Sequence, residues 1–430
     1  MAYAEKVYKV RNGKQTKQFT WKAVYKKPDG TKGTASGFPT KKTAEDWGNA
    51  QEAAIRTGRW IDPSLMQRTF GSWAREWMKG QAPRGTTTAR RWDRLEAVIF
   101  PRWGNVPMSQ ITWYEAESWA NALAIDDVSV THALSLMSTI LNGAVDAKHL
   151  LVNPLAGRRR RRTAAAKEAL QAKEEAKGNQ YAPPEVVLQL ARRAGPLDGM
   201  HILTVAFTGL RWGESIGLHR DNALLTRSEH YDGGLFECKV LRVVEEVAEY
   251  QERLPDGSKG PLVLALEPVK TRESNRRIDV PPFLEVLLHQ HLENVKTPQL
   301  FMTRSGAFWR RGNFGRQVMK PVSGGRAAAP AVRGHAQREG WEPIMPGLTM
   351  RAMRHTHDTY QAQIGVKPIL EFEQAGHKYP GIKGRYQHPT PEMRRERLEG
   401  LQEIYERAMR ALGWTEIWPP AEPSPQDSPK

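Results

Sequence analysis

The sequence predicts a multi-domain α+β protein, and three observations lead to that prediction. The chain has 430 residues, enough for two to four domains of roughly 100–200 residues each. Its hydrophobic pattern alternates near the N-terminus and follows helical spacing from about residue 69 onward. A run of five arginines near residue 160 separates this helical stretch from a third region. With 39% hydrophobic residues, each region has enough apolar side chains to form its own core.

Residues 1–60 are expected to form a small basic sheet with one helix behind it. Apolar residues alternate around Phe19, Trp21, Ala23 and Tyr25, and the sequence KPDG that follows favours a turn. Residues 18–38 therefore read as a strand, a turn and a second strand. A helix is predicted over residues 39–55, with Thr40 or Thr43 as its N-cap.

This first region is unusually basic, because residues 1–44 contain eleven Lys or Arg and only two acids. A basic sheet of this kind is a plausible reader of a DNA groove, with Lys22, Lys26 and Lys27 as candidate contacts. A generic basic α+β module remains the alternative.

Residues 69–155 are predicted to form an all-helical domain, which ends near Pro154. Residues 156–180 are expected to be a basic linker, beginning with the run Arg158, Arg159, Arg160, Arg161 and Arg162. Such a block is either solvated or lies along phosphates. Residues 181–415 read as a third, mainly helical domain with a small β-sheet, and residues 416–430 as a disordered tail rich in Pro and Ser.

The formal net charge of +17 indicates a polyanionic partner. Nucleic acid is the first interpretation, and an acidic membrane surface is the weaker one. No run approaches the roughly 18 apolar residues needed to span a membrane, and the N-terminus lacks the apolar core of a signal peptide. The lone cysteine, Cys238, excludes an internal disulfide framework and a cysteine-based zinc site. The sequence thus favours a reducing cytoplasm, and Cys238 is read as an inert small hydrophobe.

Several charged residues in the third region stand in apolar surroundings. Arg211 follows a buried-looking helix in TGLRWGE and pairs either with Glu214 or with a bound anion. Lys270 lies between two alternating stretches, which predicts a hairpin with this lysine near its turn. The sequences RAMRHT and AGHKYPGIKGRYQH follow, with Arg351, Arg354, His377 and Tyr386.

In this order and spacing, these residues resemble the catalytic domain of the tyrosine recombinases, the phage integrase family. The family shows TGLR with a Glu three residues on, a hairpin lysine, H-x-x-R-H-T, then GH and a tyrosine nine residues after that histidine. Here Tyr386 follows His377 by nine residues. The layout upstream is similar to integrases with an arm-type DNA-binding domain (1–60), a helical core-binding domain (69–155) and a catalytic domain (181–415).

The resemblance implies site-specific cutting and rejoining of double-stranded DNA attachment sites by a homotetramer in a bacterial cytoplasm. Arg211 and Arg354 would hold the phosphate, Tyr386 would be the nucleophile, Lys270 would protonate the leaving oxygen, and His377 would orient the phosphate. It implies no metal and no cofactor. A host DNA-bending factor and an excision factor are possible further partners.

One position departs from the family pattern. Arg351 stands where the family usually has a histidine that accepts the proton of the tyrosine. Arginine stays protonated and is a poor base. This difference leaves a catalytically inactive DNA-binding regulator open as an alternative to the recombinase. A type IB topoisomerase is a second alternative, because it shares the same active-site chemistry.

The same segment holds rival residues that we interpret as structural. Tyr360 and Tyr379 are read as packing tyrosines, while His355, His357 and His388 are read as local packing or capping residues. Arg272, Arg276 and Arg277, the neighbours of Lys270, are expected to be solvated or to face DNA. Residues 390–412 form an amphipathic helix, which either folds back on its own domain or docks on a neighbouring protomer.

Overall fold

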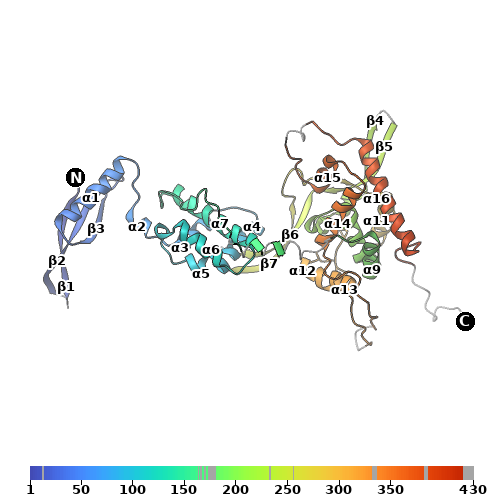
Figure 1. Cartoon of the computed structure of the whole chain (residues 1–430), viewed down its shortest axis with the longest axis horizontal. Helices are drawn as coiled ribbons and strands as arrows, with labels where there is room; N and C mark the ends of the chain where they lie inside the picture. The colour runs from blue at the N-terminus through green and yellow to red at the C-terminus, as the bar shows by residue number, and fades with distance from the viewer. Residues whose placement is uncertain are drawn as a thin grey trace. The chain divides into compact units, whose positions relative to one another are not determined.

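The computed structural model of the chain describes residues 1–11, 14–162, 164, 167–168, 171–172, 181–231, 234–254, 256–331, 337–381 and 386–419. It contains two compact units (Figure 1). Unit 1 comprises Met1–Gln171 and Arg253–Lys259, and unit 2 comprises Ala172–Glu252 and Gly260–Lys430. Helices and small antiparallel sheets occur in both, which confirms the predicted multi-domain α+β class.

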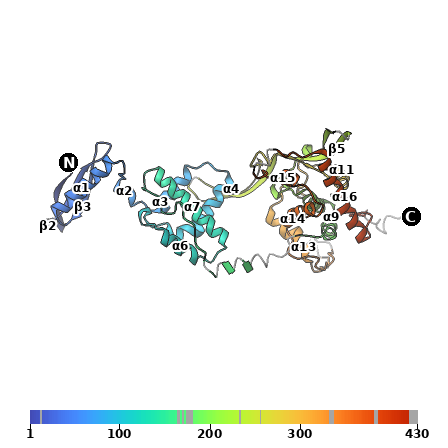
Figure 2. The ribbon, with the colours of Figure 1, turned by 45° about the horizontal axis from the view of Figure 1, so that its top comes forward.

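Unit 1 begins with a three-stranded antiparallel sheet in the order β1-β2-β3, formed by Tyr3–Arg11, Lys14–Lys26 and Lys32–Phe38. Helix α1 (Lys41–Arg56) packs along the sheet (Figure 2). Tyr25 meets Trp47 and Trp60 edge-on, at 5.6 and 6.2 Å between ring centroids, and these rings fill the space under the helix. The structure confirms both predicted strands and selects Thr40 as the N-cap.

Strand β1 was not predicted from the sequence. It lies at the edge of the sheet, and none of its residues is buried. A strand without a buried face has no reason to alternate apolar and polar residues, so its sequence carries little strand signal.

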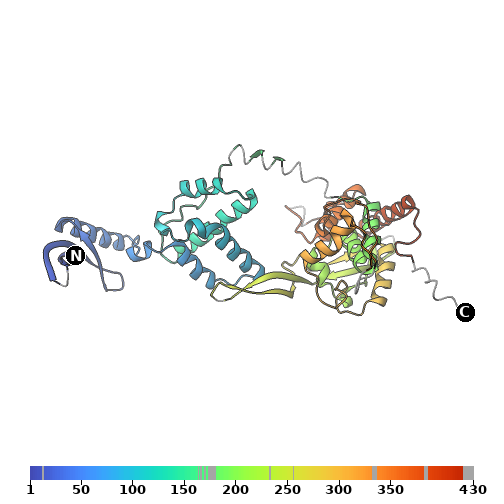
Figure 3. The same ribbon diagram turned by 90° about the horizontal axis from the view of Figure 1, so that it is seen from below.

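Residues 63–146 of unit 1 are mainly helical (Figure 3). Their helices pack around their own apolar core. The elements are α2 (Pro63–Met66), α3 (Phe70–Lys79), α4 (Gly85–Arg94), η1 (Leu95–Ile99), α5 (Phe100–Trp103), η2 (Met108–Gln110), α6 (Trp113–Ala122) and α7 (Asp127–Asp146). The indole Nε1 of Trp73 on α3 donates to the Ile140 carbonyl of α7 at 2.9 Å, which joins two helices distant in sequence.

Helix α7 is the one helix of the described residues that is long and apolar enough to cross a membrane by length and composition. Its apolar residues, among them Met137, Ile140 and Leu141, are buried against the other helices of unit 1. The apolar side chains of α7 therefore form part of the core of unit 1.

Helices of unit 2 surround α9 (Pro184–Thr208), whose second half is buried on every side. The others are α10 (Trp212–Gly217), η3 (Arg220–Asn222), α11 (Pro282–Asn294), α12 (Arg311–Phe314), η4 (Gly315–Met319), α13 (Lys320–Gly324), α14 (Met350–Gln363), α15 (Pro368–Ala375) and α16 (Pro391–Leu412). Helix α9 breaks at Gly195, whose φ of 78° lies outside the helical region and which precedes Pro196.

Two small sheets complete unit 2. One has the strand order β4-β5-β8, formed by Leu225–Tyr231, Gly234–Val243 and Arg276–Asp279, and the other pairs β6 (Glu245–Arg253) with β7 (Lys259–Pro268). Lys270 lies exposed in the loop between β7 and β8. The predicted hairpin around Lys270 is therefore wrong in its pairing, since β7 and β8 belong to different sheets. Alternation marks strands but does not identify their partners.

Helix α16 folds back on its own unit, which is one of the two arrangements left open by the sequence. Leu401, Ile404 and Ala408 are buried in the same core as α9. At its N-terminal end, Arg394 and Arg397 are also buried and pair with Asp279 of β8.

The packed chain also extends past the predicted boundary at residue 415. Ile417 is buried, and the indole Nε1 of Trp418 donates to the Ala191 carbonyl of α9 at 3.0 Å. Residues 416–419 are therefore part of the folded unit, contrary to the predicted tail. The remainder of that tail, residues 420–430, lies outside the described residues.

Candidate active site

Arg211 is placed by a glycine turn between two helices. Gly209 ends α9 with a φ of 68°, a conformation that favours glycine, and Arg211 is the N-cap of α10. A Cβ at Gly209 would lie 2.6 Å from Cδ2 of His357, so the turn also has no room for a side chain. This geometry brings the Arg211 side chain to the surface, where one third of it is exposed.

Glu214 anchors Arg211 through two hydrogen bonds. Its Oε2 accepts from the Arg211 backbone N–H at 2.9 Å, and its Oε1 accepts from Arg211 Nη1 at 2.6 Å. Glu214 is itself only 1% exposed. Burial alone would raise the pKa of Glu214, but the hydrogen bonds and charges of Arg276 and Arg211 outweigh it and lower the pKa to about 2. The ion pair therefore exists, and it fixes the orientation of Arg211.

Arg276 is a second, buried partner of the same carboxylate. Its Nη1 and Nη2 donate to the two oxygens of Glu214 at 3.0 and 2.9 Å, and its Nε donates to the Gln374 carbonyl at 2.7 Å. The expectation that Arg276 is solvated or faces DNA is wrong. The loop before β8 turns this side chain inward, an orientation that depends on tertiary packing rather than on the local sequence.

The position of the Arg276 side chain also explains why residue 376, in the sequence AGH, is a glycine. It has a φ of 65° at the end of α15, and a Cβ there would lie 2.9 Å from Nη1 of Arg276. Only glycine leaves room for the guanidinium that supports Glu214.

Arg354 approaches the cluster from α14. Its Nη1 donates to the Gly209 carbonyl, and its Nη2 donates to the Ala375 carbonyl at 3.1 Å. Burial, reinforced by the charge of Arg211, lowers the pKa of Arg354 to about 10. Among the described residues, Glu214 is thus hydrogen-bonded to Arg211 and Arg276, while Arg354 feels the charges of Glu214 and Asp358 without an ion pair to either. A cluster with this excess of positive charge favours a bound anion.

His377 follows Gly376 and faces the same cations. Partial burial lowers the pKa of the His377 imidazole, and the charges of Arg211 and Arg354 lower it further. The lowered pKa favours the neutral imidazole, which can donate or accept a hydrogen bond.

Sequence reasoning missed Asp358, one turn after Arg354 on α14. Partial removal from water raises the pKa of the Asp358 carboxyl, while the charges of Arg354, His355 and His377 oppose that rise. A helical count from Arg354 would have placed Asp358 on the same face.

Some of the predicted catalytic residues make no contact with the cluster of Arg211, Arg276 and Arg354 among the described residues. Lys270 is exposed in its loop. The side chain of Tyr386 is 77% exposed, and no contact among the described residues joins it to Arg211 or Arg354. Arg351 projects from α14 toward solvent, where its Nε donates to His355 Nε2 at 3.4 Å.

The rival tyrosines have structural roles. Tyr360 is fully buried, and its hydroxyl donates to the Ala182 carbonyl at 3.2 Å. Burial raises the pKa of the Tyr360 phenol, which makes it a poor nucleophile. Tyr379 packs edge-on against Phe372, with 5.0 Å between ring centroids. Burial likewise raises the pKa of the Cys238 thiol to about 12, in agreement with an inert cysteine.

The predicted DNA-binding arginines of residues 158–162 divide into two groups. Arg160 is nearly buried, pairs with Asp127 at the start of α7 and donates to the Ala120 carbonyl at 3.1 Å. Arg162 Nε also binds Asp127, at 2.8 Å. Arg158 and Arg159 are exposed, as is Arg161, whose backbone N–H donates to Glu117 at 2.7 Å. The charge of Arg160 is therefore paired within unit 1.

A basic groove of about 780 Å³ lies beside this arginine run, within unit 1. Hydroxyl residues of α7, including Ser135 and Thr139, form one wall, and Arg158 and Arg159 form another. Lys167 also lines the groove. Cations and hydroxyl donors on one surface suit the phosphates of a nucleic acid.

The three predicted lysines of the N-terminal sheet also differ from one another. Lys27 binds Asp62 at 2.6 Å and thereby ties the end of β2 to the segment after α1. Lys22 binds Glu5 on the neighbouring strand at 2.6 Å. Lys26 is exposed and is the lysine of this group without an ion pair among the described residues. The charges of Lys27 and Lys22 are thus paired within the domain, and Lys26 is the strongest candidate for a DNA contact among the three.

No group of three or more His, Cys, Asp or Glu side chains within the described part of the chain is arranged to hold a metal ion. The cationic cluster is built from arginines, which repel metal ions and attract anions.

The structure is similar to that of the Tn1549 transposon integrase in complex with transposon right end DNA, at 16% sequence identity and a TM-score of 0.49, covering 80% of this chain and 100% of that chain. It is also similar to a lambda integrase tetramer bound to a Holliday junction, at 14% identity and a TM-score of 0.45, covering 85% and 92%. Neither the protein-family models nor the curated proteins give a match. At this level of similarity, the residues of the chain itself have to carry an assignment of function.

Proposed function

We propose that this chain is a site-specific DNA recombinase of the tyrosine recombinase family, which integrates or excises a mobile DNA element. The observation that carries the proposal is the placement of Arg211 and Arg354 at the Gly209 turn, where their charges act on each other and on His377. The ordered motifs that end in Tyr386 identify the anion as a DNA phosphodiester.

The arginines bind the two non-bridging oxygens of the phosphate. A guanidinium presents paired donors that match phosphate geometry and keeps its charge at all working pH values. Glu214 and the carbonyls of Gly209 and Ala375 hold Arg211 and Arg354 before DNA arrives. Such preorganised charge stabilises the additional negative charge that develops on the oxygens in the transition state.

Tyr386 then attacks the phosphorus through its phenolic oxygen. The new bond joins that oxygen to phosphorus, the bond from phosphorus to the 5′-oxygen breaks, and a 3′-phosphotyrosine remains. Lys270 donates a proton to the departing 5′-oxygen. The attack of a second 5′-hydroxyl reverses these steps and joins the new strand without another energy source.

Arg351 stays protonated and cannot accept the proton of the phenol, so water or another group takes it. Arg351 lowers the pKa of an approaching phenol by its charge. Tyr386 is exposed and has to move toward the arginines after DNA binds. This movement ties cleavage to the assembled complex, for which the family resemblance suggests a tetramer.

The remaining parts of the chain bind DNA outside the cleavage point. Lys26 and its neighbouring strands contact distal arm sites, while the groove lined by Arg158 and Arg159 contacts phosphates of the core site. The net charge of +17 supports both contacts.

The decisive experiment captures covalent protein–DNA adducts. Purified protein is incubated with fragmented genomic DNA, denatured in detergent, and the DNA that remains attached is sequenced. Tyr386→Phe is the test variant, and Tyr379→Phe is the matched control because Tyr379 packs against Phe372. We expect adducts at one short site with the wild type and with Tyr379→Phe, and none with Tyr386→Phe.

Two other outcomes contradict the proposal. Adducts without sequence preference would identify a type IB topoisomerase. Specific binding of DNA without any adduct would identify an inactive regulator and would make Arg351→His the next variant.

A further inference from the structure

A second basic pocket lies in unit 2 beside the cluster of Arg211 and Arg354. It has a volume of about 580 Å³. Its charged lining consists of six cationic side chains and two carboxylates: Arg227, Arg242, Arg276, Arg277, Arg394, Lys378, Glu273 and Glu373. Phe372 and Tyr379 add an apolar part of the wall.

Three of these arginines form ion pairs with carboxylates. Arg227 and Arg394 bind Asp279 at 2.8 and 3.1 Å, and Arg276 binds Glu214. Arg394 also binds Glu373 at 2.7 Å. These ion pairs hold β8, α15 and α16 together and leave little charge for a ligand.

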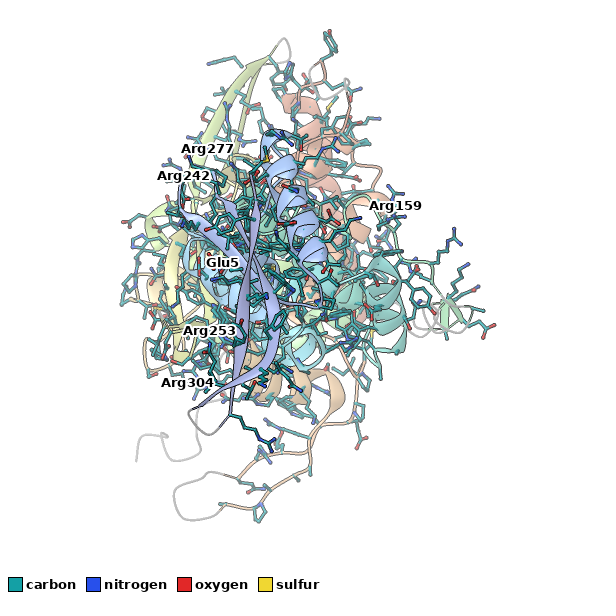
Figure 4. All side chains as sticks on the ribbon, turned by 90° about the vertical axis from the view of Figure 1, so that its left-hand side faces the viewer. Glu5, Arg159, Arg242, Arg253, Arg277 and Arg304 are labelled. Carbon is teal, nitrogen blue, oxygen red and sulfur yellow. The ribbon has the colours of Figure 1, made fainter. Side chains whose placement is uncertain are left out.

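Arg242 and Arg277 differ from the other three. They are exposed and lie directly opposite each other on β5 and β8 (Figure 4). No ion pair among the described residues involves either side chain, and Glu273 in the same pocket is joined to neither. Like charges directly opposite each other in a sheet destabilise it. An anion between or above the two guanidiniums would relieve this repulsion.

The pocket is continuous with the proposed active site, because Arg276 and His377 line it. Arg276 binds Glu214, and the charges of Arg211 and Arg354 act on His377. A polyanion bound across those arginines would therefore continue into this pocket. Two guanidiniums side by side suit a phosphate better than a lone carboxylate, because they offer paired donors to several oxygens.

We infer that Arg242 and Arg277 together bind a second DNA phosphate, adjacent to the phosphate that is cut. This inference rests on the proposed function for the identity of the anion. The pair positions the DNA strand and takes no part in bond breaking. Because its two members face one phosphate, their combined contribution to binding equals one phosphate contact.

The test measures how the affinity of the full-length chain for a random-sequence DNA duplex depends on salt. The test variant is the double substitution Arg242→Ala with Arg277→Ala. One lost phosphate contact reduces the slope of log affinity against log salt by about 0.9. The loss of affinity between 50 and 200 mM salt should therefore shrink about 3-fold relative to the wild type.

Two matched variants separate position from charge. Arg304→Ala with Arg310→Ala removes the same charge from another pocket of unit 2 and should leave the slope unchanged. Arg242→Lys with Arg277→Lys keeps the charge and should retain the slope. Thermal unfolding of each variant checks that the fold is intact, which we expect because both arginines are exposed.

Three results would overturn the inference. The first is a slope for the Arg242/Arg277 alanine variant that equals the wild-type slope. The second is loss of calorimetric binding of inorganic phosphate with an unchanged DNA slope, which would assign the pocket to a free phosphate. The third is altered self-association with an unchanged DNA slope, which would assign it to a protein segment.

This experiment requires no cleavage. A reduced slope in a protein that forms no covalent adduct would therefore sustain the phosphate site and refute only the recombinase function.

Discussion

Replacing Glu214 by Gln should destabilise unit 2 and disorganise the arginine cluster. Glu214 is the carboxylate that holds both Arg211 and Arg276, and the Arg276 side chain is only 4% exposed. The amide keeps the shape of the side chain but removes the negative charge. Arg276 then remains buried without a counter-charge, which is costly in a protein interior.

The magnitude follows from the pKa of Glu214. It is about 2 in the folded chain, against 4.5 for a free glutamate. This difference corresponds to about 3 kcal/mol of folding stability. Breaking a buried ion pair by removing one partner costs about 3–5 kcal/mol, which agrees in size.

The sign of the pH dependence follows from the lowered pKa. A carboxyl with a depressed folded pKa contributes its full stability above its unfolded value, about 4.5 here, and loses it as pH falls toward 2. The wild-type chain should thus lose this contribution between these pH values. Glu214→Gln should lack it at every pH.

Hydrogen exchange of unit 2 peptides measures this free energy without interference from unit 1. Glu406→Gln is the matched control, because Glu406 pairs with Arg410 at the surface at 3.6 Å and should contribute almost nothing. Substituting Arg276 by Met in the Glu214→Gln background should recover part of the loss, since the buried charge is then gone. A cost below about 1 kcal/mol for Glu214→Gln would refute the role assigned to this carboxylate.

Three further predictions concern other residues. Arg160→Met should lower the unfolding free energy of unit 1 by about 2 kcal/mol, because Asp127 then keeps only Arg162 as its partner. Arg159→Met should alter only the salt dependence of DNA binding. Equal unfolding midpoints in urea for the two variants would contradict this. Lys27→Met should reduce the thermal stability of the N-terminal sheet, and Lys26→Met should reduce the affinity for DNA. The prediction fails if Lys26→Met lowers the melting temperature while Lys27→Met weakens DNA binding. Arg351→His should speed the formation of covalent adducts by up to about 100-fold at pH values above the imidazole pKa. Quenched-flow cleavage measures this rate. An unchanged rate at every pH would show that residue 351 does not accept the proton of the phenol.

The sequence by itself located most of the elements and named the candidate site residues. Hydrophobic spacing located α9 and α16, the KPDG turn located two strands, and the ordered motifs singled out Arg211, Arg354 and His377. These signals are local, since a helix face, a turn or a short motif is written in neighbouring residues. The charge of +17 indicated the polyanionic partner in the same direct way.

The tertiary structure decided which charges are free and which are used within the protein. The sequence presents Arg160, Lys27 and Arg276 as equals of their basic neighbours, yet each is paired with an acid distant along the chain. It also decided that β8 pairs with β5 and not with β7, which places Arg277 opposite Arg242. Ion pairs and strand partners depend on contacts between distant segments, and a local pattern carries no record of them.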